Sequence, residues 1–415
     1  MTDVFIVGVG MTPLGKHLDK TVKQLTAQAV QAALKDADAR REDIQAAWFC
    51  NTRQGALEGQ HGIRGQCSLR AFGFESIPIF NTDNACASSS SGLMQAYAAV
   101  RAGIHEVAMV VGAEKMHYPE KRKEMFDAFK GSWDRDLADS HMRALLAMGQ
   151  DLVLPPEALE DTGERSVFMD IYAAMARFHM HRFGTTPAQI ASVAAKNHWH
   201  SQFNPMAQYR TPMTVDEVLR DRLIAWPMTR AMCAPMSDGA CALIVASKQV
   251  LSRFNGKRAV RIRGMGVSSG SKREVKDVER HLTRVACDRA YEMAGVGPKD
   301  ISLAELHDAS AIAEILHSEN CGFCDYGDGG ALVESGATKL GGLLPINTSG
   351  GLLSKGHPIG ATGAIQIRDL VVQLRGEAGE SQVEEASIGL AENGGGFYGL
   401  EEAACVVTVL ERYVA

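Results

Sequence analysis

The sequence predicts an α/β protein built from two similar halves. Short apolar runs of the strand type alternate with helical patterns over residues 4–113, which favours a sheet covered by helices. A second observation is a repeat: the order helix, polar turn with an Asp-Ile pair, then strand occurs at residues 32–50 and again at 290–307. The length of 415 residues also exceeds one ordinary core. A duplicated α/β chain predicts a pseudo-twofold architecture, with function where the halves meet.

The first half is predicted to span residues 1–254. A buried strand over residues 4–10 is followed by an amphipathic helix over 21–36, and further strands are expected at 46–50, 77–80 and 106–113, in a largely parallel sheet. The pattern changes between about residues 116 and 205, where a charged, irregular stretch precedes a methionine-bearing helix over 166–183. This segment reads as an insertion over the first core, and strand-like sequence returns at 232–246.

The second half is predicted to span residues 255–415. Its opening strand, from residue 260, matches the first strand of the chain, and residues 346–351 echo residues 80–85. Further strands are expected just before His307 and over residues 386–390.

Composition excludes several classes of protein. A net charge of −6 and a pI near 6.1 argue against nucleic acid as a partner. No apolar run approaches the ~20 residues that a membrane span needs, and the opening apolar run reads as a strand rather than a signal peptide. Nine scattered cysteines indicate a reducing compartment, so we expect a cytoplasmic protein. The pair Cys321 and Cys324 lacks a second pair at zinc-binding spacing, so no metal is expected.

The stretch around Cys86 has the character of a nucleophile site. Cys86 lies between an expected strand and an expected helix, and four serines and a glycine follow it closely. Free N–H groups at a helix start favour a thiolate, and small neighbours let a substrate approach, so we expect a depressed pKa for Cys86. A buried structural cysteine beside an N-capping serine cluster is the alternative that these local features leave open.

Three loops of the second half have residues typical of a ligand-binding or catalytic site. His307 stands at the carboxyl end of a predicted strand, where α/β folds place ligands. His357 lies in the glycine-dense stretch 347–363, and residues 392–397 contain three consecutive glycines that offer backbone N–H groups. A plain flexible turn is the alternative for the glycines, and satisfied core histidines are the alternative for His307 and His357.

In combination these motifs resemble the thiolase superfamily. They are Cys86-Ala-Ser-Ser, Gly356-His-Pro-Ile-Gly-Ala-Thr-Gly363 and the terminal triple glycine, in this order along a duplicated chain. The resemblance covers essentially the whole chain and implies the thiolase fold, two βαβαβαββ halves in an αβαβα layered arrangement with an inserted loop domain. The loop His307-Asp-Ala-Ser is similar to that of sterol-carrier-protein-type and archaeal thiolases.

The resemblance implies a role for each matching residue. Cys86 would attack the substrate carbonyl and carry the acyl group, and His357 would take the thiol proton. His307 would stand in an oxyanion hole, and the backbone N–H groups of Cys86 and Gly394 would form a second one. Many thiolases use a second cysteine as acid and base, but its two possible positions hold Glu392 and Ala309 here. Proton transfer at the substrate α-carbon must then fall to Glu392, His307, His357 or water.

The resemblance further implies an acyl-CoA thiolase, which cleaves a β-keto acyl-CoA with CoA or runs the reverse condensation. Coenzyme A is then a substrate, and no cofactor is expected. The absent second cysteine argues against a short-chain generalist, so we expect a bulky or aromatic substrate such as 2-benzoylsuccinyl-CoA. The alternatives are an archaeal-type acetoacetyl-CoA thiolase, a retro-aldolase of steroid side-chain degradation and a non-catalytic scaffold subunit. The resemblance to such thiolases also implies that the chain forms a homodimer and pairs with a small OB-fold/zinc-ribbon subunit.

Two features of the insertion suggest binding surfaces. Its densest basic run holds Lys121, Arg122 and Lys123, which with Ser354 of the glycine-rich loop are the predicted CoA-binding residues; a solvated helix face is the alternative for the run. A second feature is a helical stripe that would shape an acyl tunnel or, alternatively, pack in the core or against a second subunit: Met169, Tyr172, Met175 and Phe178.

Overall fold

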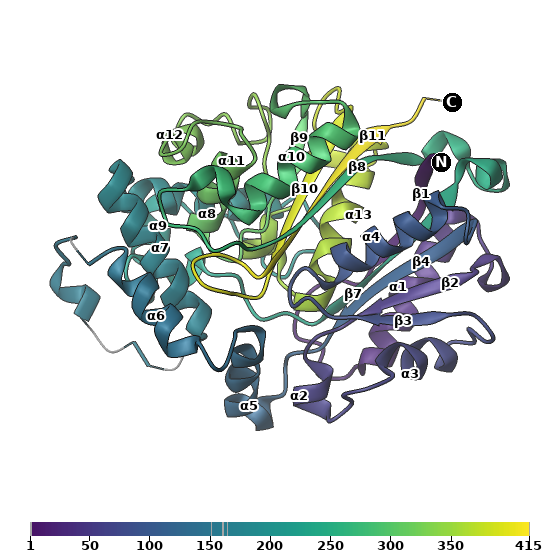
Figure 1. Ribbon diagram of the computed structural model, residues 1–415, viewed down its shortest axis with the longest axis horizontal. Helices are drawn as coiled ribbons and strands as arrows, with labels where there is room; N and C mark the ends of the chain where they lie inside the picture. The colour runs from purple at the N-terminus through teal and green to yellow at the C-terminus, as the bar shows by residue number, and fades with distance from the viewer. Residues whose placement is uncertain (1, 151, 160–161, 164, 415) are drawn as a thin grey trace.

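The computed structural model describes residues 2–150, 152–159, 162–163 and 165–414. Its largest feature is a nine-stranded sheet in the order β3-β2-β4-β7-β1-β8-β11-β10-β9 (Figure 1). The first half supplies β1 (Val4–Met11), β2 (Ala46–Cys50), β3 (Ile79–Thr82), β4 (Val107–Glu114) and β7 (Gly239–Ser247). The second half supplies β8 (Val260–Ser269), β9 (Leu303–Glu305), β10 (Ile388–Gly395) and β11 (Ala404–Arg412).

The two halves of the sheet repeat one arrangement in reverse order. Strands β1, β2, β4 and β7 correspond to β8, β9, β10 and β11, and the halves join through a short pairing of β1 with β8. A bridge between Ala304 and Ile346 takes the place in the second half of the β2–β3 pairing, which accounts for the sequence echo between residues 346–351 and 80–85. The predicted duplication of the fold is therefore confirmed.

The expectation of a largely parallel sheet is wrong. Among the described strands only the pairs β2–β3, β2–β4 and β9–β10 run parallel, and the other neighbours in the large sheet are antiparallel. The last strand of each half, β7 or β11, runs back against both of its neighbours. Apolar patterning shows that a strand is buried but not its direction, so the sequence offered no signal for this reversal.

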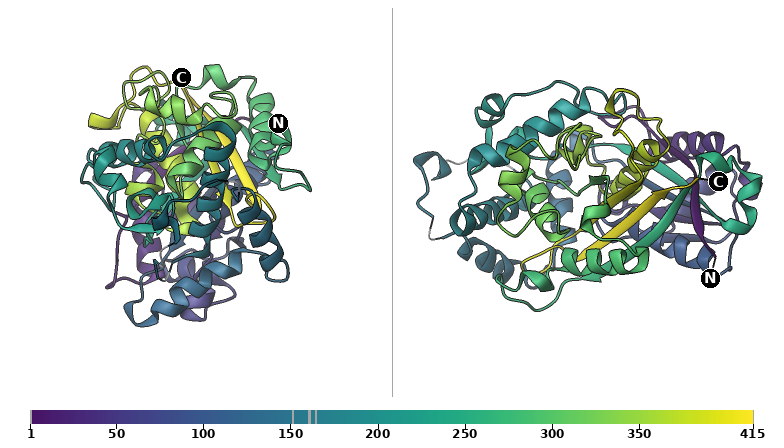
Figure 2. Two further views of the ribbon diagram at one scale, coloured as in Figure 1. Left: turned by 90° about the vertical axis from the view of Figure 1, so that its left-hand side faces the viewer. Right: turned by 90° about the horizontal axis from the view of Figure 1, so that it is seen from above.

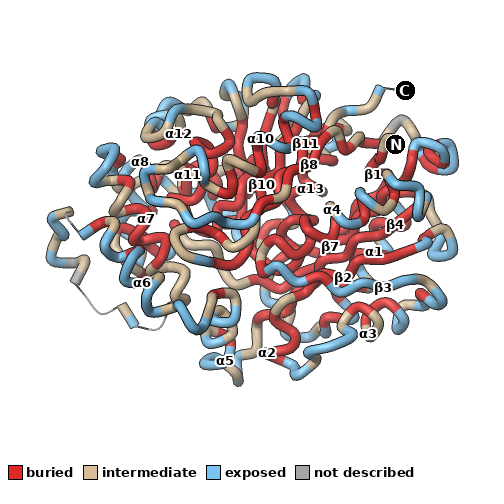
Figure 3. The backbone as a smooth tube through the Cα atoms, in the orientation of Figure 1, coloured by how far each residue is buried: buried red, intermediate tan, exposed pale blue. Residues whose placement is uncertain are grey.

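Helices complete five layers. Helices α4 (Ser88–Arg101) and α13 (Thr362–Leu374) share one buried cluster with strands of both half-sheets and form the central layer. Helix α1 (Val22–Ala37), with α3 (Arg64–Ala71), covers the first half, and α10 (Leu282–Ala294) covers the second. Figure 2 shows the arrangement of helices and strands from two further directions, and Figure 3 shows the buried backbone concentrated in both half-sheets and the central helices.

Glycines bring each outer helix close to its sheet in the same way. A Cβ on Gly10 of β1 would lie 2.3 Å from the backbone nitrogen of Ala33 in α1. A Cβ on Gly266 of β8 would lie 1.9 Å from the carbonyl oxygen of Ala286 in α10. Because no side chain fits at either contact, the glycines at equivalent places in the two opening strands fix the helix-to-sheet spacing in both halves.

The inserted segment lies between β4 and β7 and forms a helical layer at one end of the sheet (Figure 1). It contains α5 (Arg122–Asp127), α6 (Ala138–Ala147), α7 (Val167–Phe183), α8 (Pro187–Ser201), α9 (Val215–Leu219) and a hairpin of β5 (Leu223–Ala225) and β6 (Met228–Thr229). These elements continue past residue 205, and β7 begins only at Gly239. The insertion packs on α11 (Ala311–Asn320) and near α12 (Gly329–Glu334). The remaining helix, α2 (Gln54–Glu58), follows β2.

The described helices include none whose length and apolar content would let it cross a lipid bilayer.

Candidate active site

Cys86 occupies the turn between β3 and α4, two residues before the helix begins. Ala85, directly before it, adopts a positive φ of 49°, which is uncommon for a residue with a side chain. The turn is held by Ser88, whose hydroxyl donates to the Ala85 carbonyl at 2.6 Å and accepts the Asn84 N–H at 2.9 Å. The serine that follows Cys86 in the motif therefore stabilises a strained turn that presents the thiol at the start of a helix.

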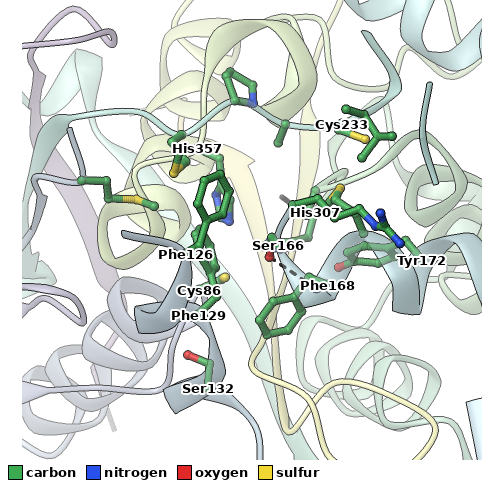
Figure 4. A pocket seen from close by; sticks show the side chains of 18 of the residues that line it. Cys86, Phe126, Phe129, Ser132, Ser166, Phe168, Tyr172, Cys233, His307 and His357 are labelled. Carbon is green, nitrogen blue, oxygen red and sulfur yellow. Dashed lines mark hydrogen bonds between the residues drawn. The ribbon is translucent and has the colours of Figure 1, made fainter. Parts of the chain in front are cut away.

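The two predicted histidines converge on Cys86. Its Sγ and one ring nitrogen each of His307 and His357 lie within 4.8 Å of one another. The two rings are nearly perpendicular, with centroids 5.2 Å apart. Figure 4 shows the three side chains around one pocket. His307 follows β9, and His357 follows a π-helical turn at Gly351–Lys355, so both histidines come from the second half of the chain. Because Cys86 follows β3 in the first half, the two halves together form the trio.

Hydrogen bonds assign His307 a proton on Nε2. The Ser90 hydroxyl lies 2.6 Å from Asn393 Oδ1 and 3.0 Å from the Ala87 carbonyl oxygen. With its single proton in the shorter contact, the amide is oriented so that its Nδ2 donates to His307 Nδ1 at 2.9 Å. With Nδ1 accepting, the ring proton must sit on Nε2. His307 therefore presents a hydrogen-bond donor, which is what an oxyanion hole requires.

The assignment for His357 is the opposite. Its Nδ1 lies 2.7 Å from Thr362 Oγ1, and that hydroxyl is directed at the Pro358 carbonyl at 3.5 Å. A Thr362 hydroxyl that donates to the Pro358 carbonyl accepts from Nδ1–H of His357, and Nε2 of His357 then keeps a free lone pair. One histidine offers a donor and the other a base, so the trio can remove a thiol proton and stabilise an oxyanion at the same time.

Burial keeps the resting trio uncharged. Desolvation raises the pKa of Cys86 to about 12, against the opposing effects of the Arg53 charge and of backbone N–H groups, including that of Gly396. The expectation of a depressed pKa for Cys86 is therefore wrong, because the free-energy cost of removing the thiolate from water exceeds the stabilisation that the N–H groups at the helix start provide. Desolvation, with the Arg53 charge, lowers the pKa of His357 to about 3, and desolvation also lowers that of His307 far below its usual range.

The glycine run after β10 lies against the nucleophile turn. A Cβ on Gly395 would lie 2.2 Å from the Asn84 carbonyl oxygen, so only glycine fits there. Gly394, the predicted oxyanion-hole residue, lines the pocket, but the N–H that reaches the Cys86 sulfur belongs to Gly396. The sequence indicated the run correctly, but it could not show which of its N–H groups faces the thiol.

Two predicted site residues point elsewhere. Ser354, predicted to bind CoA, is fully buried, and its hydroxyl contacts Ser201 Oγ at 2.6 Å and His198 Nδ1 at 3.1 Å; this corrects its assignment to a ligand site. Glu392 is also fully buried and does not line the pocket. Its carboxylate accepts the backbone N–H of His307 at 3.1 Å, so Glu392 positions the His307 loop instead of reaching a substrate.

The pocket is a cavity of ≈ 280 Å³ with an aromatic wall. Figure 4 shows Phe126 and Phe129 on the same side as Cys86, with Phe168 and Tyr172 opposite. The predicted stripe on α7 divides: Tyr172 and Met169 line this cavity, whereas Met175 and Phe178 line a second one. The three phenylalanines were not singled out from the sequence, although they stand in the insertion that was expected to cover Cys86.

The predicted CoA-binding run is only partly directed at this cavity. Arg122 lines it and is exposed. Lys121 donates to the Leu57 carbonyl at 2.6 Å and lies over the Tyr118 ring, and Lys123 is exposed without lining the pocket. Further arginines surround the cavity and were not identified from the sequence: Arg53, Arg165, Arg222 and Arg230.

Comparisons with known proteins agree with this geometry. Residues 4–249 match the family described as thiolase, N-terminal domain, and residues 264–411 match the thiolase C-terminal domain-like family. The chain is 33% identical to an acetyl-CoA acetyltransferase of Methanothermobacter thermautotrophicus, over 95% of this chain and 97% of that protein. It is 31% identical to the benzoylsuccinyl-CoA thiolase subunit BbsB of Thauera aromatica, over 92% of this chain and 91% of that subunit.

Solved structures share the fold at lower identity. The Ltp2-ChsH2(DUF35) aldolase superimposes with a TM-score of 0.77 at 24% identity, covering 100% of this chain and 99% of that one. Human mitochondrial 3-ketoacyl-CoA thiolase superimposes with a TM-score of 0.68 at 16% identity, covering 100% and 99%. The family matches span both halves of the duplicated fold, and the chain therefore belongs to the thiolase family and is a thiolase-type acyltransferase.

Proposed function

We propose that this chain cleaves a bulky or aromatic β-keto acyl-CoA with CoA, through an acyl group carried on Cys86. The observation that carries the proposal is the trio of Cys86, His307 and His357, whose two rings have opposite proton assignments. A base and a fixed donor within 4.8 Å of one thiol are the groups that acyl transfer to a cysteine requires.

The steps follow from these assignments. Nε2 of His357 takes the thiol proton as the Cys86 sulfur attacks the ketone carbon of the substrate. The bond between that carbon and the α-carbon breaks, and its electron pair goes to the α-carbon as an enolate of the CoA thioester. His307 Nε2–H donates to the developing oxyanion. The His357 imidazolium returns its proton to the α-carbon, and the shortened acyl-CoA leaves. The thiol of a new CoA then gives its proton to His357 and attacks the acyl-cysteine, and that proton passes to the Cys86 sulfur as the second acyl-CoA is released.

The wall of the cavity supports the choice of acyl group. Phe126, Phe129 and Phe168 give it flat apolar surfaces, and Met169 can adapt to an irregular ligand. A flat aryl ketone would bury its ring against these side chains, whereas an acetyl group would leave the surfaces unfilled. A relative named as a subunit of benzoylsuccinyl-CoA thiolase agrees with an aromatic substrate.

We also propose that a small subunit of the OB-fold/zinc-ribbon class completes the enzyme. The support is that one relative is named as a subunit, and that the aldolase of similar fold is named together with a DUF35 component. The same proposal includes a homodimer of the present chain. It also includes binding of CoA by Arg122 and Lys123.

The test compares two substrates with and without the partner. The purified chain, alone and with a small zinc-binding protein that co-purifies with it, is assayed for thiolysis of benzoylacetyl-CoA and of acetoacetyl-CoA. The proposal predicts a higher kcat/KM for benzoylacetyl-CoA and a gain on adding the partner. Faster cleavage of acetoacetyl-CoA by the chain alone, with no gain from the partner, would favour the archaeal-type acetoacetyl-CoA thiolase.

A further inference from the structure

Arg53 is a buried cation in the wall of the catalytic cavity. It follows β2, directly before α2, and only 5% of the residue is exposed. It lines the same cavity as Cys86 and His357, and its charge acts on both of these residues. No step of the proposed reaction uses it.

The guanidinium is incompletely paired. Nη1 donates to the Ala128 carbonyl at 2.6 Å, and Nη2 donates to the Ser132 hydroxyl at 2.9 Å. The group also lies 5.2 Å from the centre of the Phe129 ring. A guanidinium has five N–H donors, and the Nε–H of Arg53 is buried without a partner in the described part of the chain.

No described carboxylate forms an ion pair with Arg53. The two whose charges act on it are Glu114 and Asp83. The oxygens of Glu114 accept from Asn51 Nδ2 and from the backbone N–H groups of Thr52, Arg53 and Gly360. Asp83 contacts Thr52 and pairs with Arg64 at 3.6 Å. Both acids are therefore engaged elsewhere, and the Arg53 guanidinium has no charge partner of its own among the described residues.

An unpaired buried charge is unfavourable, and arginine cannot relieve it by losing its proton. A ligand that brings an anion into the cavity would remove this penalty. Ser132 adds a second group suited to that ligand, because its oxygen already accepts from Arg53 while its own proton has no acceptor among the described residues. A carboxylate could accept from the Arg53 fork and from the Ser132 hydroxyl together.

We propose that Arg53 and Ser132 bind a carboxylate on the acyl part of the substrate, so that the preferred substrate is an acidic β-keto acyl-CoA. This inference rests on the proposed thiolase function and adds the charge of the acyl group to it. The fork of Arg53 lies beside the aromatic wall that includes Phe129. The site therefore fits an acyl group that carries both an aromatic ring and a carboxylate.

Two other roles for Arg53 predict different results. Arg53 could serve only to stabilise the Cys86 thiolate, or only to hold residues 128–132 against the core. Either role would make an Arg53 variant lose activity equally on charged and neutral substrates. A charge-specific loss is expected only if Arg53 contacts the substrate.

The first experiment uses two substrates that differ by one carboxymethyl group, 2-benzoylsuccinyl-CoA and benzoylacetyl-CoA. For Arg53→Gln, kcat/KM for 2-benzoylsuccinyl-CoA should fall at least about 30-fold more than for benzoylacetyl-CoA, since a buried charge pair loses one partner. Arg53→Lys should restore part of the preference, because it keeps the charge but not the fork. Lys130→Gln is the matched control: it removes one positive charge from an exposed position on the same segment and should leave the preference unchanged.

The second experiment needs no turnover. Cys86 is alkylated with iodoacetate and with iodoacetamide, which have similar size but differ in charge, and the modified peptide is quantified by mass spectrometry. In the wild-type chain the ratio of the iodoacetate rate to the iodoacetamide rate should exceed that of 2-mercaptoethanol by about tenfold. In Arg53→Gln most of this excess should be lost, because it comes from the Arg53 charge and not from the other arginines around the cavity. Any change in the thiol pKa cancels in this ratio.

The outcomes separate this inference from the proposed function. A wild-type ratio equal to that of 2-mercaptoethanol, or equal losses on both substrates in Arg53→Gln, would overturn the carboxylate site while leaving an aromatic thiolase intact. Failure of the wild-type chain to cleave either of the two substrates would instead contradict the proposed function. If Arg53→Gln does not fold, the wild-type ratio and Arg53→Lys still decide the question.

Discussion

The pH dependence of Cys86 alkylation should show whether the resting site holds a thiol or a thiolate. With the pKa of Cys86 raised to about 12, only about 10⁻⁵ of the sulfur is ionised at pH 7. A free thiol with a pKa of about 8.5 is ionised to a few per cent at the same pH. The higher intrinsic nucleophilicity of a basic thiolate recovers part of this difference, which leaves Cys86 about 100-fold slower than an unperturbed cysteine in a short unstructured peptide.

The assay follows iodoacetamide labelling of the Cys86 peptide from pH 6 to 10 by mass spectrometry. Because the folded-state pKa lies above this range, the rate should rise about tenfold per pH unit without a plateau. 2-Mercaptoethanol serves as the control for the intrinsic pH dependence of the reagent. A plateau that begins at or below pH 7 would refute the reasoning, since it would indicate a thiolate paired with the His357 imidazolium.

Four substitutions test the remaining contacts. His357→Ala removes the base, so kcat for thiolysis should fall by about 10²–10⁴. Asn393→Asp replaces the donor to His307 Nδ1 by an acceptor and moves the ring proton away from Nε2, so kcat should fall by about 10²–10³. Gly395→Ala places a methyl 2.2 Å from the Asn84 carbonyl oxygen, so urea unfolding should show a loss of about 1–3 kcal/mol, and an unchanged midpoint would contradict the close approach. Lys123→Glu should raise KM for CoA more at low than at high salt if this exposed lysine meets the CoA phosphates; no change at either salt leaves it as a solvated side chain.

The sequence was sufficient for the parts of the site that lie in local motifs. The strand-like run before Cys86 and the helical pattern after it predicted a strand-to-helix turn, and the glycine-dense loop around His357 predicted a site residue. At the Cys86 turn and in the His357 loop, residues that are neighbours in the sequence determine the backbone conformation. The duplicated order of elements likewise predicted the two-half fold.

The features that the sequence missed depend on contacts between distant segments. Asn393 fixes the tautomer of His307, and Arg53 reaches Ser132 across 79 positions of the chain. Neither pairing leaves a periodic pattern. Ser354 was misassigned because a glycine-rich loop has an inner and an outer face that composition does not distinguish. The pKa of Cys86 was expected in the wrong direction because the extent of desolvation is a property of the folded chain.

The same reasoning explains the error about strand direction. The apolar runs of β7 and β11 resemble those of the parallel strands β2, β4 and β9, since these strands are buried on both faces. The length of the connection does not determine the reversal, because β7 is reversed after the long inserted segment and β11 after the short connection 396–403.

Trapping the acyl-enzyme tests the central claim most directly. The chain is mixed with benzoylacetyl-CoA in the absence of free CoA, quenched in acid and digested, and the peptide that contains Cys86 is examined by mass spectrometry. The account predicts a benzoyl group on Cys86, its loss on adding CoA, and no labelling in Cys86→Ser. Cleavage of the substrate with no acyl group on Cys86, or near-normal thiolysis by Cys86→Ser, would contradict it.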